Sequence, residues 1–341
     1  MAAKSKSIIG YDPHYQVQEV IGKGAMGEVM LCHDEYLDRP LVIKRMQLSL
    51  LNSREMQERF QREVLVLSHL RHPNIVDIYG FWLREGQLHL SMEFVNGWTL
   101  RQLMDQVPRP PLWVTLVVLW EALVALEYAH ADYAHRHIGP VIHRDIKPTN
   151  MMIGFNGRLK LLDFGISKPR QSSEITQPGT QIGTIAYMSP EQVHEDAVTP
   201  ATDIFSMGVI ALEMLGGKHP FRAANALQTC RNVLEQDPDW SRYFSGVPAS
   251  LGLLLRQMLR KDPARRPTAQ QALEALQPVL DGLPRDPCAL MGNYILHVRH
   301  PEEVPPPPEP RLAARVTPGW LYALVGVLAG FVAGLVAARF G

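Results

Sequence analysis

Short apolar runs separated by glycine and polar turn residues open the chain, and they predict β-strands. The runs lie at residues 17–21, 29–32, 41–43, 75–83 and 88–94. Before the last two runs, Phe60, Val64 and Leu67 recur at spacings of four and three, which predicts one face of a helix. From residue 99 the apolar period is mainly helical, with long runs at 112–128, 204–215 and 251–259. The pattern therefore predicts an α+β fold in which a small β-rich part precedes a larger helical part.

The globular pattern fades after about residue 280 and is followed by a proline-rich stretch at 301–310. Consecutive prolines fix φ and remove amide donors, so this stretch predicts an extended, semi-rigid spacer. A ligand for a proline-binding module is the alternative interpretation.

Residues 320–338 form an apolar run of 19 residues that is interrupted only by the amphipathic Tyr322. A helix of that length rises about 28 Å, close to the roughly 30 Å hydrocarbon core of a bilayer. Arg311 and Arg315 precede the run, which favours a cytoplasmic location for that end. We therefore expect a single transmembrane helix in a lipid bilayer, with the rest of the chain on the cytoplasmic side. A buried helix of the globular part is the alternative.

Within this run Gly326, Gly330 and Gly334 repeat every fourth residue. Such a doubled G-x-x-x-G face lets two helix backbones approach closely in lipid, which would make a homodimer. Glycine is also common in membrane helices without any dimerisation, so both interpretations remain open.

The overall charge is balanced, because Lys and Arg together number 34, as do Asp and Glu. A net charge of zero provides no overall field to attract nucleic acid, and we expect no nucleic-acid partner. Cys32, Cys230 and Cys288 lie far apart and form no C-x-x-C pair, which argues against a disulfide framework or a zinc site. The composition is that of a globular protein in a reducing compartment.

A glycine-rich stretch, Gly22-Lys-Gly-Ala-Met-Gly27, interrupts the first strands. Its G-x-G-x-x-G spacing lets a backbone come close to phosphate oxygens. Because the chain continues as a strand from Val29, the spacing favours a phosphate-covering hairpin over a dinucleotide-binding turn. Lys44 ends a later strand, where it could hold phosphate oxygens with Glu63 as its partner. A surface charge is the alternative for each of these two residues alone.

The string His143-Arg-Asp-Ile-Lys-Pro-Thr-Asn150 is followed by Asp163-Phe-Gly165. With the glycine-rich stretch, Val42-Ile-Lys44 and Ser189-Pro-Glu191, these motifs stand in the order and at the spacing found in protein kinases. The chain thus resembles the eukaryotic-type (Hanks-type) Ser/Thr protein kinases, in particular their bacterial, membrane-anchored members.

The resemblance implies a two-lobed protein kinase fold, with a small β-rich N-terminal lobe and a larger α-helical C-terminal lobe. The division that we expect is a polar tail at 1–14, the kinase domain at 15–280, a proline-rich juxtamembrane linker at 281–317 and a transmembrane helix at 318–339. The implied activity is transfer of the ATP γ-phosphate to Ser/Thr hydroxyls of cytoplasmic proteins in signalling. A membrane-anchored, nucleotide-binding pseudokinase scaffold is the alternative.

By the same resemblance, Asp145 and Lys147 are the catalytic residues, and Asn150 and Asp163 hold Mg²⁺, for which Mn²⁺ could substitute. The residues expected to contact ATP are Ile21, Gly22, Lys23, Gly24, Ala25, Met26, Gly27, Glu28, Val29, Val42, Lys44, Glu63 and Met152. The residues expected to support the site are Arg144, Asp203 and the ion-paired Glu191 and Arg266. Val42 stands where the family usually has Ala, and Ser189 replaces the Ala of A-P-E, but neither change removes a reacting group.

The stretch between Gly165 and Gly183 resembles an activation segment. We expect autophosphorylation at Thr176 or Thr180, with Arg144 as the cation that receives the phosphate. Ordinary solvated hydroxyls are the alternative for these threonines, and Thr184 is expected to contact the catalytic residues.

His130, His135 and His137 lie shortly before the catalytic string. We favour a solvated loop over a metal site for these histidines.

Overall fold

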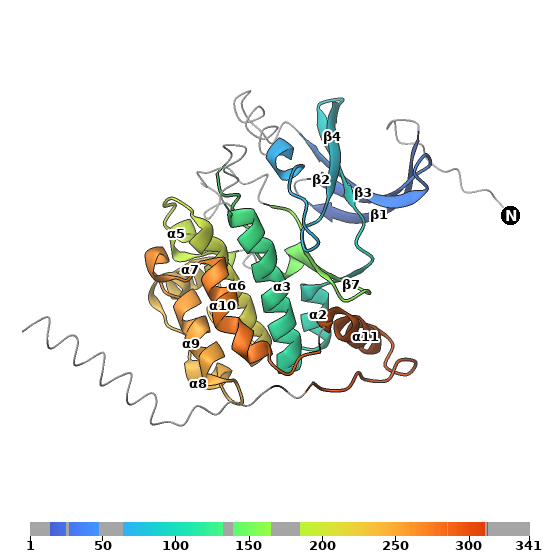
Figure 1. Cartoon of the computed structure of the whole chain (residues 1–341). Coiled ribbons are helices and arrows are strands. Elements are labelled where there is room, and N and C mark those ends of the chain that lie inside the picture. The colour runs from blue at the N-terminus through green and yellow to red at the C-terminus, as the bar shows by residue number, and fades with distance from the viewer. Residues whose placement is uncertain are drawn as a thin grey trace, which may run out of the picture.

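A five-stranded antiparallel sheet forms the smaller of two lobes (Figure 1). Its members, in the spatial order β1-β2-β3-β5-β4, are β1 (Tyr15–Gly24), β2 (Gly27–Asp34), β3 (Arg39–Gln47), β4 (Ile78–Arg84) and β5 (Gln87–Glu93). Successive side chains of a strand point to opposite faces. Met30, Cys32 and Ile43 accordingly pack on one face of the sheet, while Val42 and Met46 join the main core on the other.

This computed structural model describes residues 14–24, 27–47, 64–131, 139–164, 185–284, 286–310 and 312. Of the helix predicted around Phe60, residues 64–67 are described; they are helical, and Val64 and Leu67 are buried. The predicted strands at 17–21, 29–32 and 41–43 fall within β1, β2 and β3.

The larger lobe is mainly helical, as the apolar period predicts. Its helices are α2 (Leu100–Gln106), α3 (Leu112–His130), α5 (Pro190–Val193), α6 (Pro200–Gly216), α7 (Ala226–Glu235), α8 (Trp240–Tyr243), α9 (Ala249–Met258), α10 (Ala269–Leu280) and α11 (Pro287–Arg299), with 3-10 turns η2 (Pro148–Asn150) and η3 (Pro263–Arg265). A second sheet lies in this lobe and was not predicted, because its strands are too short to show a period. It consists of β6 (Gly97–Thr99), β7 (Met151–Gly154) and β8 (Leu159–Leu161).

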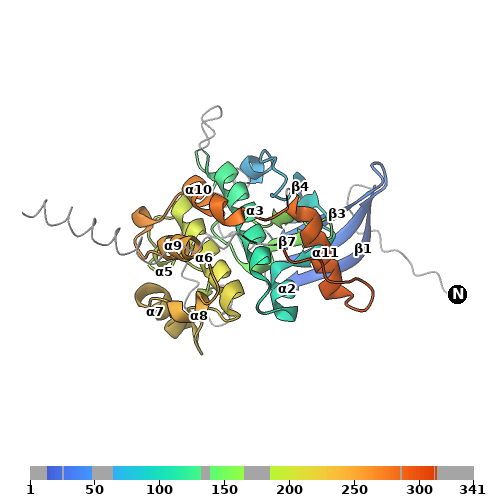
Figure 2. The same ribbon diagram turned by 60° about the horizontal axis from the view of Figure 1, so that its bottom comes forward.

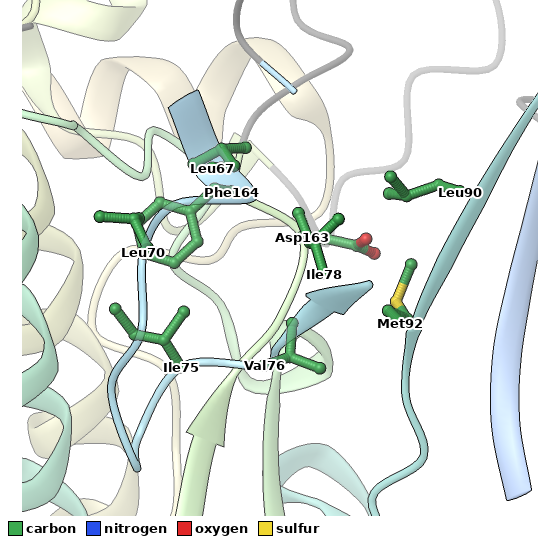
Figure 3. A pocket seen from close by; sticks show the side chains of 9 residues that line it. All are labelled: Leu67, Leu70, Ile75, Val76, Ile78, Leu90, Met92, Asp163 and Phe164. Atoms are coloured by element: carbon green, nitrogen blue, oxygen red, sulfur yellow. The ribbon is translucent and has the colours of Figure 1, made fainter. Parts of the chain in front are cut away.

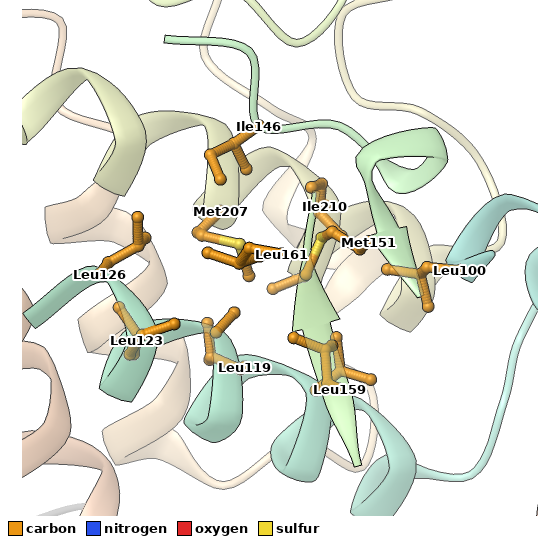
Figure 4. Close-up of a cluster of buried hydrophobic side chains, with 14 of the residues drawn as sticks. Leu100, Leu119, Leu123, Leu126, Ile146, Met151, Leu159, Leu161, Met207 and Ile210 are labelled. Carbon is orange, nitrogen blue, oxygen red and sulfur yellow. The ribbon is translucent and has the colours of Figure 1, made fainter. Parts of the chain in front are cut away.

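Helices α3 and α6 form the centre of the larger lobe. Figure 4 shows Leu119, Leu123 and Leu126 of α3 in the same cluster as Met207 and Ile210 of α6, and all five are fully buried. A helix that is apolar on every side belongs in a core. Among the described residues, α3 is the one helix long and apolar enough to cross a bilayer, but 72% of its most apolar stretch is buried inside the protein. Its apolar character is therefore explained by its central position.

The segment predicted as a linker at 281–317 contains a docked helix, which corrects that prediction. Helix α11 lies beside α2 and α3 in both views (Figures 1 and 2). Met291, Tyr294 and Ile295 are buried against the domain. The prediction failed because α11 has a weak amphipathic pattern, and its buried positions are recognisable only from what they contact. The proline-rich residues 305–310 that follow form no helix or strand.

Helix α11 lies directly on the turn between β7 and β8. A Cβ on Gly292 would meet the carbonyl oxygen of Phe155 at 2.7 Å, and one on Gly157, whose φ is +80°, would meet that of Cys288 at 1.7 Å. The Cys288 thiol also donates to the buried carboxylate of Glu121 at 3.1 Å, and the same carboxylate accepts from the backbone N–H of Leu159 in β8. Burial raises the pKa of Glu121 and that of Cys288, the latter to about 12. Helix α11 is thus held against the hairpin by close backbone packing and a shared carboxylate.

We expect Gly292→Leu to lower the free energy of unfolding by about 1–3 kcal/mol, because the added side chain forces α11 away from the β7–β8 turn. Ala289→Leu, on the exposed face of the same helix, should change it by less than about 0.5 kcal/mol. Urea unfolding of both variants measures the difference. Equal effects would show that α11 does not need its close approach to the hairpin.

Candidate functional site

The catalytic string forms a loop that ends at η2 and runs into β7. Its polar side chains meet: Lys147 Nζ lies 2.8 Å from Asp145 Oδ2, and Asn150 Nδ2 donates to the same oxygen at 2.9 Å. The Asn150 amide donates a second bond, also of 2.9 Å, to the Asp145 backbone carbonyl. The Asp145 carboxylate is therefore held between a cation and an amide, with 15% of its side chain exposed.

Asp203 of α6 binds the backbone of this loop through hydrogen bonds. Its carboxylate accepts the backbone N–H groups of His143, at 2.8 Å, and of Arg144, at 2.9 Å. It also accepts from the Nε2 atom of His130 at 2.8 Å. Burial alone would raise the pKa of Asp203, but the hydrogen bonds from His130 and His143 outweigh burial and keep that pKa below its usual value. An ionised carboxylate thus fixes the backbone that leads into Asp145.

The role of His130 was not predicted. The sequence interpretation placed it in a solvated loop, whereas it is the last residue of α3 and only 8% of its side chain is exposed. The signal available in the sequence was its position at the end of an apolar helix. His135 and His137 lie outside the described residues.

His143 links the catalytic loop to the chain that leads to Asp163. Its Nε2 lies 2.8 Å from the carbonyl oxygen of Leu162, so Nε2 must carry the proton that is donated. Its Nδ1 then accepts from the backbone N–H of Asp145 at 3.3 Å. Full burial lowers the pKa of His143, which matches the neutral ring that these two bonds assign. Phe164 packs against this ring in a tilted arrangement, with 4.4 Å between the ring centroids and 35° between the ring planes.

Two residues of the site have left-handed backbone conformations. The φ angle is +65° at Arg144 and +49° at Asp163. Residues other than glycine adopt this region at a cost of about 1–2 kcal/mol, so the surrounding contacts must hold them there. Such strain next to Asp145 and at Asp163 is typical of a functional site.

Lys44 crosses from the smaller lobe to the larger one. It lies on β3, and its Nζ donates to Asp163 Oδ1 at 2.8 Å. The side chain of Asp163 remains 37% exposed. Glu63, the predicted partner of Lys44, lies outside the described residues. A cation from one lobe and a carboxylate from the other therefore meet at the boundary between the lobes.

The strands on either side of residues 25 and 26, β1 and β2, pair antiparallel with Gly24 opposite Gly27. Lys23 and Glu28 pair across these strands with 3.2 Å between Nζ and Oε1, and Glu28 also pairs with Arg45 on β3. Hydrogen bonds from Lys23 and Arg45 hold the pKa of Glu28 below its usual value. Glu28 on β2 thus links the neighbouring strands β1 and β3 through its two ion pairs.

The residues that are predicted to contact the base of a bound nucleotide come from both lobes. Val29 and Val42 lie on β2 and β3 of the smaller sheet, and Met152 lies on β7 of the larger lobe. Ile21 on the edge strand β1 is 47% exposed. The lobe boundary therefore carries apolar side chains on each side.

An apolar pocket opens beside Asp163 (Figure 3). It is lined by Leu67, Leu70, Ile75, Val76, Ile78, Leu90, Met92, Asp163 and Phe164. Figure 3 shows Asp163 and Met92 on neighbouring parts of its wall. Met92 was not among the predicted residues, because a buried methionine in a strand looks like any core residue.

Glu191 and Arg266 form a buried, bidentate ion pair. The two guanidinium nitrogens Nη1 and Nη2 lie 2.7 and 2.8 Å from the two carboxylate oxygens. Arg266 also donates to the carbonyl oxygens of Arg260, Ala201 and Lys261. Burial alone would raise the pKa of Glu191, but the guanidinium keeps it below its usual value. The pair ties α5 to α6 and to the chain before α10.

The remaining predicted residues lie outside the described part of the chain. They are Ala25, Met26, Glu63, Thr176, Thr180 and Thr184, together with the predicted transmembrane helix and its Gly326, Gly330 and Gly334.

The oxygen donors at the site suit a magnesium ion. Asp163 offers a part-exposed carboxylate, and Asn150 offers its amide oxygen, since its amide nitrogen is used by Asp145. Mg²⁺ prefers oxygen ligands and is usually held by one or two protein side chains together with substrate phosphates. Within the described ranges, no group of three or more His, Cys, Asp or Glu side chains forms a separate metal site.

Comparisons with known proteins agree with this geometry. Residues 15–276 match the family model described as protein kinase domain. The serine/threonine-protein kinase PrkC of Bacillus subtilis is 34% identical over 263 residues, covering 76% of this chain and 39% of that protein. PknB of Mycobacterium leprae is 32% identical over 74% of this chain and 40% of its own length, and PknA of Corynebacterium glutamicum is 33% identical over 76% and 54%. The aligned part of this chain thus spans about half or less of the length of these relatives.

Two glycines of the glycine-rich stretch should respond differently to substitution. A Cβ on Gly27, whose φ is +143°, would lie 1.8 Å from the carbonyl oxygen of Arg45, whereas one on Gly22 would only touch Val29 at 3.5 Å. We expect Gly27→Ala to lower the free energy of unfolding by about 1–3 kcal/mol and Gly22→Ala by less than about 1 kcal/mol. Urea unfolding measures both. Equal losses would mean that the packing of β2 on β3 does not require Gly27.

Proposed function

The chain belongs to the protein kinase family, and we propose that it transfers the γ-phosphoryl group of ATP to serine and threonine hydroxyls of proteins. The observation that carries the proposal is the Asp145 carboxylate, held by Lys147 and Asn150 at the boundary between the lobes. Phosphoryl transfer needs positioning and electrostatic stabilisation more than covalent chemistry, and this arrangement can supply both.

Asp145 would accept the proton of the attacking hydroxyl. Its carboxylate is held by Lys147 and by one donated bond of Asn150, whose second bond goes to the backbone carbonyl of Asp145. Lys147 would place its charge where negative charge develops on the transferred group. Lys two residues after the catalytic Asp is typical of the Ser/Thr members of the family, which supports this substrate class.

ATP would bind between the lobes. The base would lie between Val42 above and Met152 below, with Ile21 and Val29 beside it, and Lys44 would bind phosphate oxygens. The glycine-rich stretch from Gly22 to Gly27 would cover the phosphates, and the space beside Gly22 leaves room for a close approach. The supporting observation is that these residues come from both lobes, so closing the lobes would enclose the nucleotide.

Asn150 and Asp163 would hold magnesium, with manganese as a substitute. The ion neutralises negative charge on the phosphates when it is bound. The bond between Lys44 and Asp163 holds the Asp163 carboxylate at the lobe boundary, near the place where the phosphates would lie. Arg144 would receive a phosphate on Thr176 or Thr180, if the chain phosphorylates its own activation segment.

The decisive experiment compares phosphate incorporation from labelled ATP into a protein substrate by the unchanged chain and by Asp145→Asn. We expect the rate of phosphate transfer by the variant to fall at least about 1,000-fold, because the amide cannot accept the proton. Its melting temperature should change little. Mass spectrometry of the same samples checks for phosphate between residues 166 and 184.

Lys160→Gln is a suitable control, since Lys160 pairs with Glu93 at 2.8 Å outside the catalytic loop. It should keep most of the activity. Background incorporation by both the unchanged chain and Asp145→Asn would contradict the kinase proposal and leave the nucleotide-binding scaffold.

The proposed cellular location is a membrane, with the kinase domain on the cytoplasmic side. The supporting observation is the charge-free run at 320–338 after Arg311 and Arg315. Gly326, Gly330 and Gly334 would let two such helices pack as a homodimer.

A chain that ends at residue 312 tests this location, because it keeps every described residue. We expect the full chain to sediment with membranes after a high-salt wash and the shortened chain to stay in the supernatant with its kinase activity intact. Gly330→Leu in the full chain should reduce self-association in a membrane reporter. Equal sedimentation of the two chains would contradict the anchor.

A further inference from the structure

The side-chain amide of Gln192 joins two elements of the site. Gln192 lies in α5, where its Oε1 accepts the backbone N–H of Ser189 at 3.0 Å and so caps the start of that helix. Its Nε2 donates to the backbone carbonyl of Arg144 at 2.8 Å. The side-chain amide of Gln192 therefore helps to cap the start of α5 and also bonds to Arg144, the residue before Asp145.

That contact completes the restraint on a strained part of the loop. Arg144 has a φ of +65°, and its N–H is held by Asp203 at 2.9 Å. Its carbonyl is held by Gln192, and the N–H of the next residue, Asp145, donates to His143 at 3.3 Å. Both ends of the peptide unit between Arg144 and Asp145 are thus hydrogen-bonded. This peptide unit sets the direction in which the Asp145 side chain leaves the backbone.

The element that carries Gln192 is itself firmly held. The preceding residue, Glu191, forms the bidentate pair with Arg266 and accepts a hydrogen bond from Thr202 Oγ1 at 2.8 Å. Glu191 and Arg266 are each less than 7% exposed. A donor on such an anchored helix can hold the Arg144 carbonyl in one place, whereas a donor on a loose loop could not.

We propose that Gln192 is a positioning residue for phosphoryl transfer, which holds Asp145 in its reactive orientation through the Arg144 carbonyl. The inference rests on the proposed kinase activity. It assigns Gln192 a role in the rate of the chemical step and none in nucleotide binding, because its side-chain hydrogen bonds within the described part of the chain go to Ser189 and Arg144 and not to residues proposed to bind ATP.

The chain contains a matched control in α10. There Gln271 makes the same capping bond, its Oε1 accepting the backbone N–H of Thr268 at 2.9 Å. Gln271 is exposed, and no bond to the catalytic loop is found for it in the part of the chain that the structure describes. The same substitution at 192 and at 271 therefore changes one cap each, but only the first changes a contact with Arg144.

Gln192→Glu keeps the capping acceptor, removes the donor and sets a carboxylate oxygen against the Arg144 carbonyl. We expect kcat to fall about tenfold or more, with the KM for ATP within about twofold of the unchanged chain, because misplacing a catalytic group slows the reaction without altering binding. Amide hydrogen exchange in residues 143–147 should rise. Gln271→Glu should leave kcat, KM and this exchange unchanged.

Gln192→Met and Gln271→Met form a second pair, in which the cap is lost as well. We expect the two to lower the melting temperature to a similar extent, with only Gln192→Met lowering kcat. If Gln192→Glu does not fold, this second pair still tests whether Gln192 affects kcat through Arg144.

Unchanged kcat and unchanged exchange in the folded variants at 192 would overturn the proposal, and so would an equal loss of kcat at 271. The exchange measurement needs no turnover. If the unchanged chain transfers no phosphate, the kinase proposal fails, while the exchange in residues 143–147 still shows whether Gln192 restrains the loop.

Discussion

The buried carboxylate of Asp203 is the constraint on which the rest of the site depends. It accepts the N–H groups of His143 and Arg144 and the ring of His130, so one side chain joins α6, the end of α3 and the catalytic loop. A buried charge is costly unless hydrogen bonds satisfy it, and here they do so well enough to keep the carboxylate ionised. Helices α3 and α6 form the centre of the larger lobe. The bonds of Asp203 therefore fix the catalytic loop to the packed core.

The loop needs that rigidity because its backbone is strained. Arg144 and Asp163 both have left-handed conformations, which would relax if their hydrogen-bond partners were mobile. The Glu191–Arg266 pair supplies a second fixed support through α5, and the neutral ring of His143 bridges the loop to Leu162. The polar side chains of Asp145, Lys147 and Asn150 can therefore be held at hydrogen-bonding distance of one another.

The hairpin that contributes Met152 to the proposed nucleotide site has a different support. The β7–β8 hairpin, which carries Met152 and leads to Asp163, packs under α11, and Glu121 of α3 bonds to both of them. The family model ends at residue 276, before this helix begins. In this chain the segment between the kinase domain and the proposed membrane helix is consequently part of the surface that holds the hairpin.

Much of this could be predicted from the amino-acid sequence. The change of apolar period near residue 99 predicts a β-rich part followed by a helical part, and the resemblance carried by the ordered motifs implies the two lobes and the roles of Asp145, Lys147, Asn150 and Asp163. The contacts of His130, Gln192 and α11 could not be predicted in this way. Each depends on a partner 48 to 167 residues away in the chain, and the residue types beside it do not identify that partner. The sequence by itself determined which groups could do the chemistry. Only the tertiary structure decided what holds them, because hydrogen bonds to backbone groups and close backbone packing depend on distance in space and leave no pattern in the residue types.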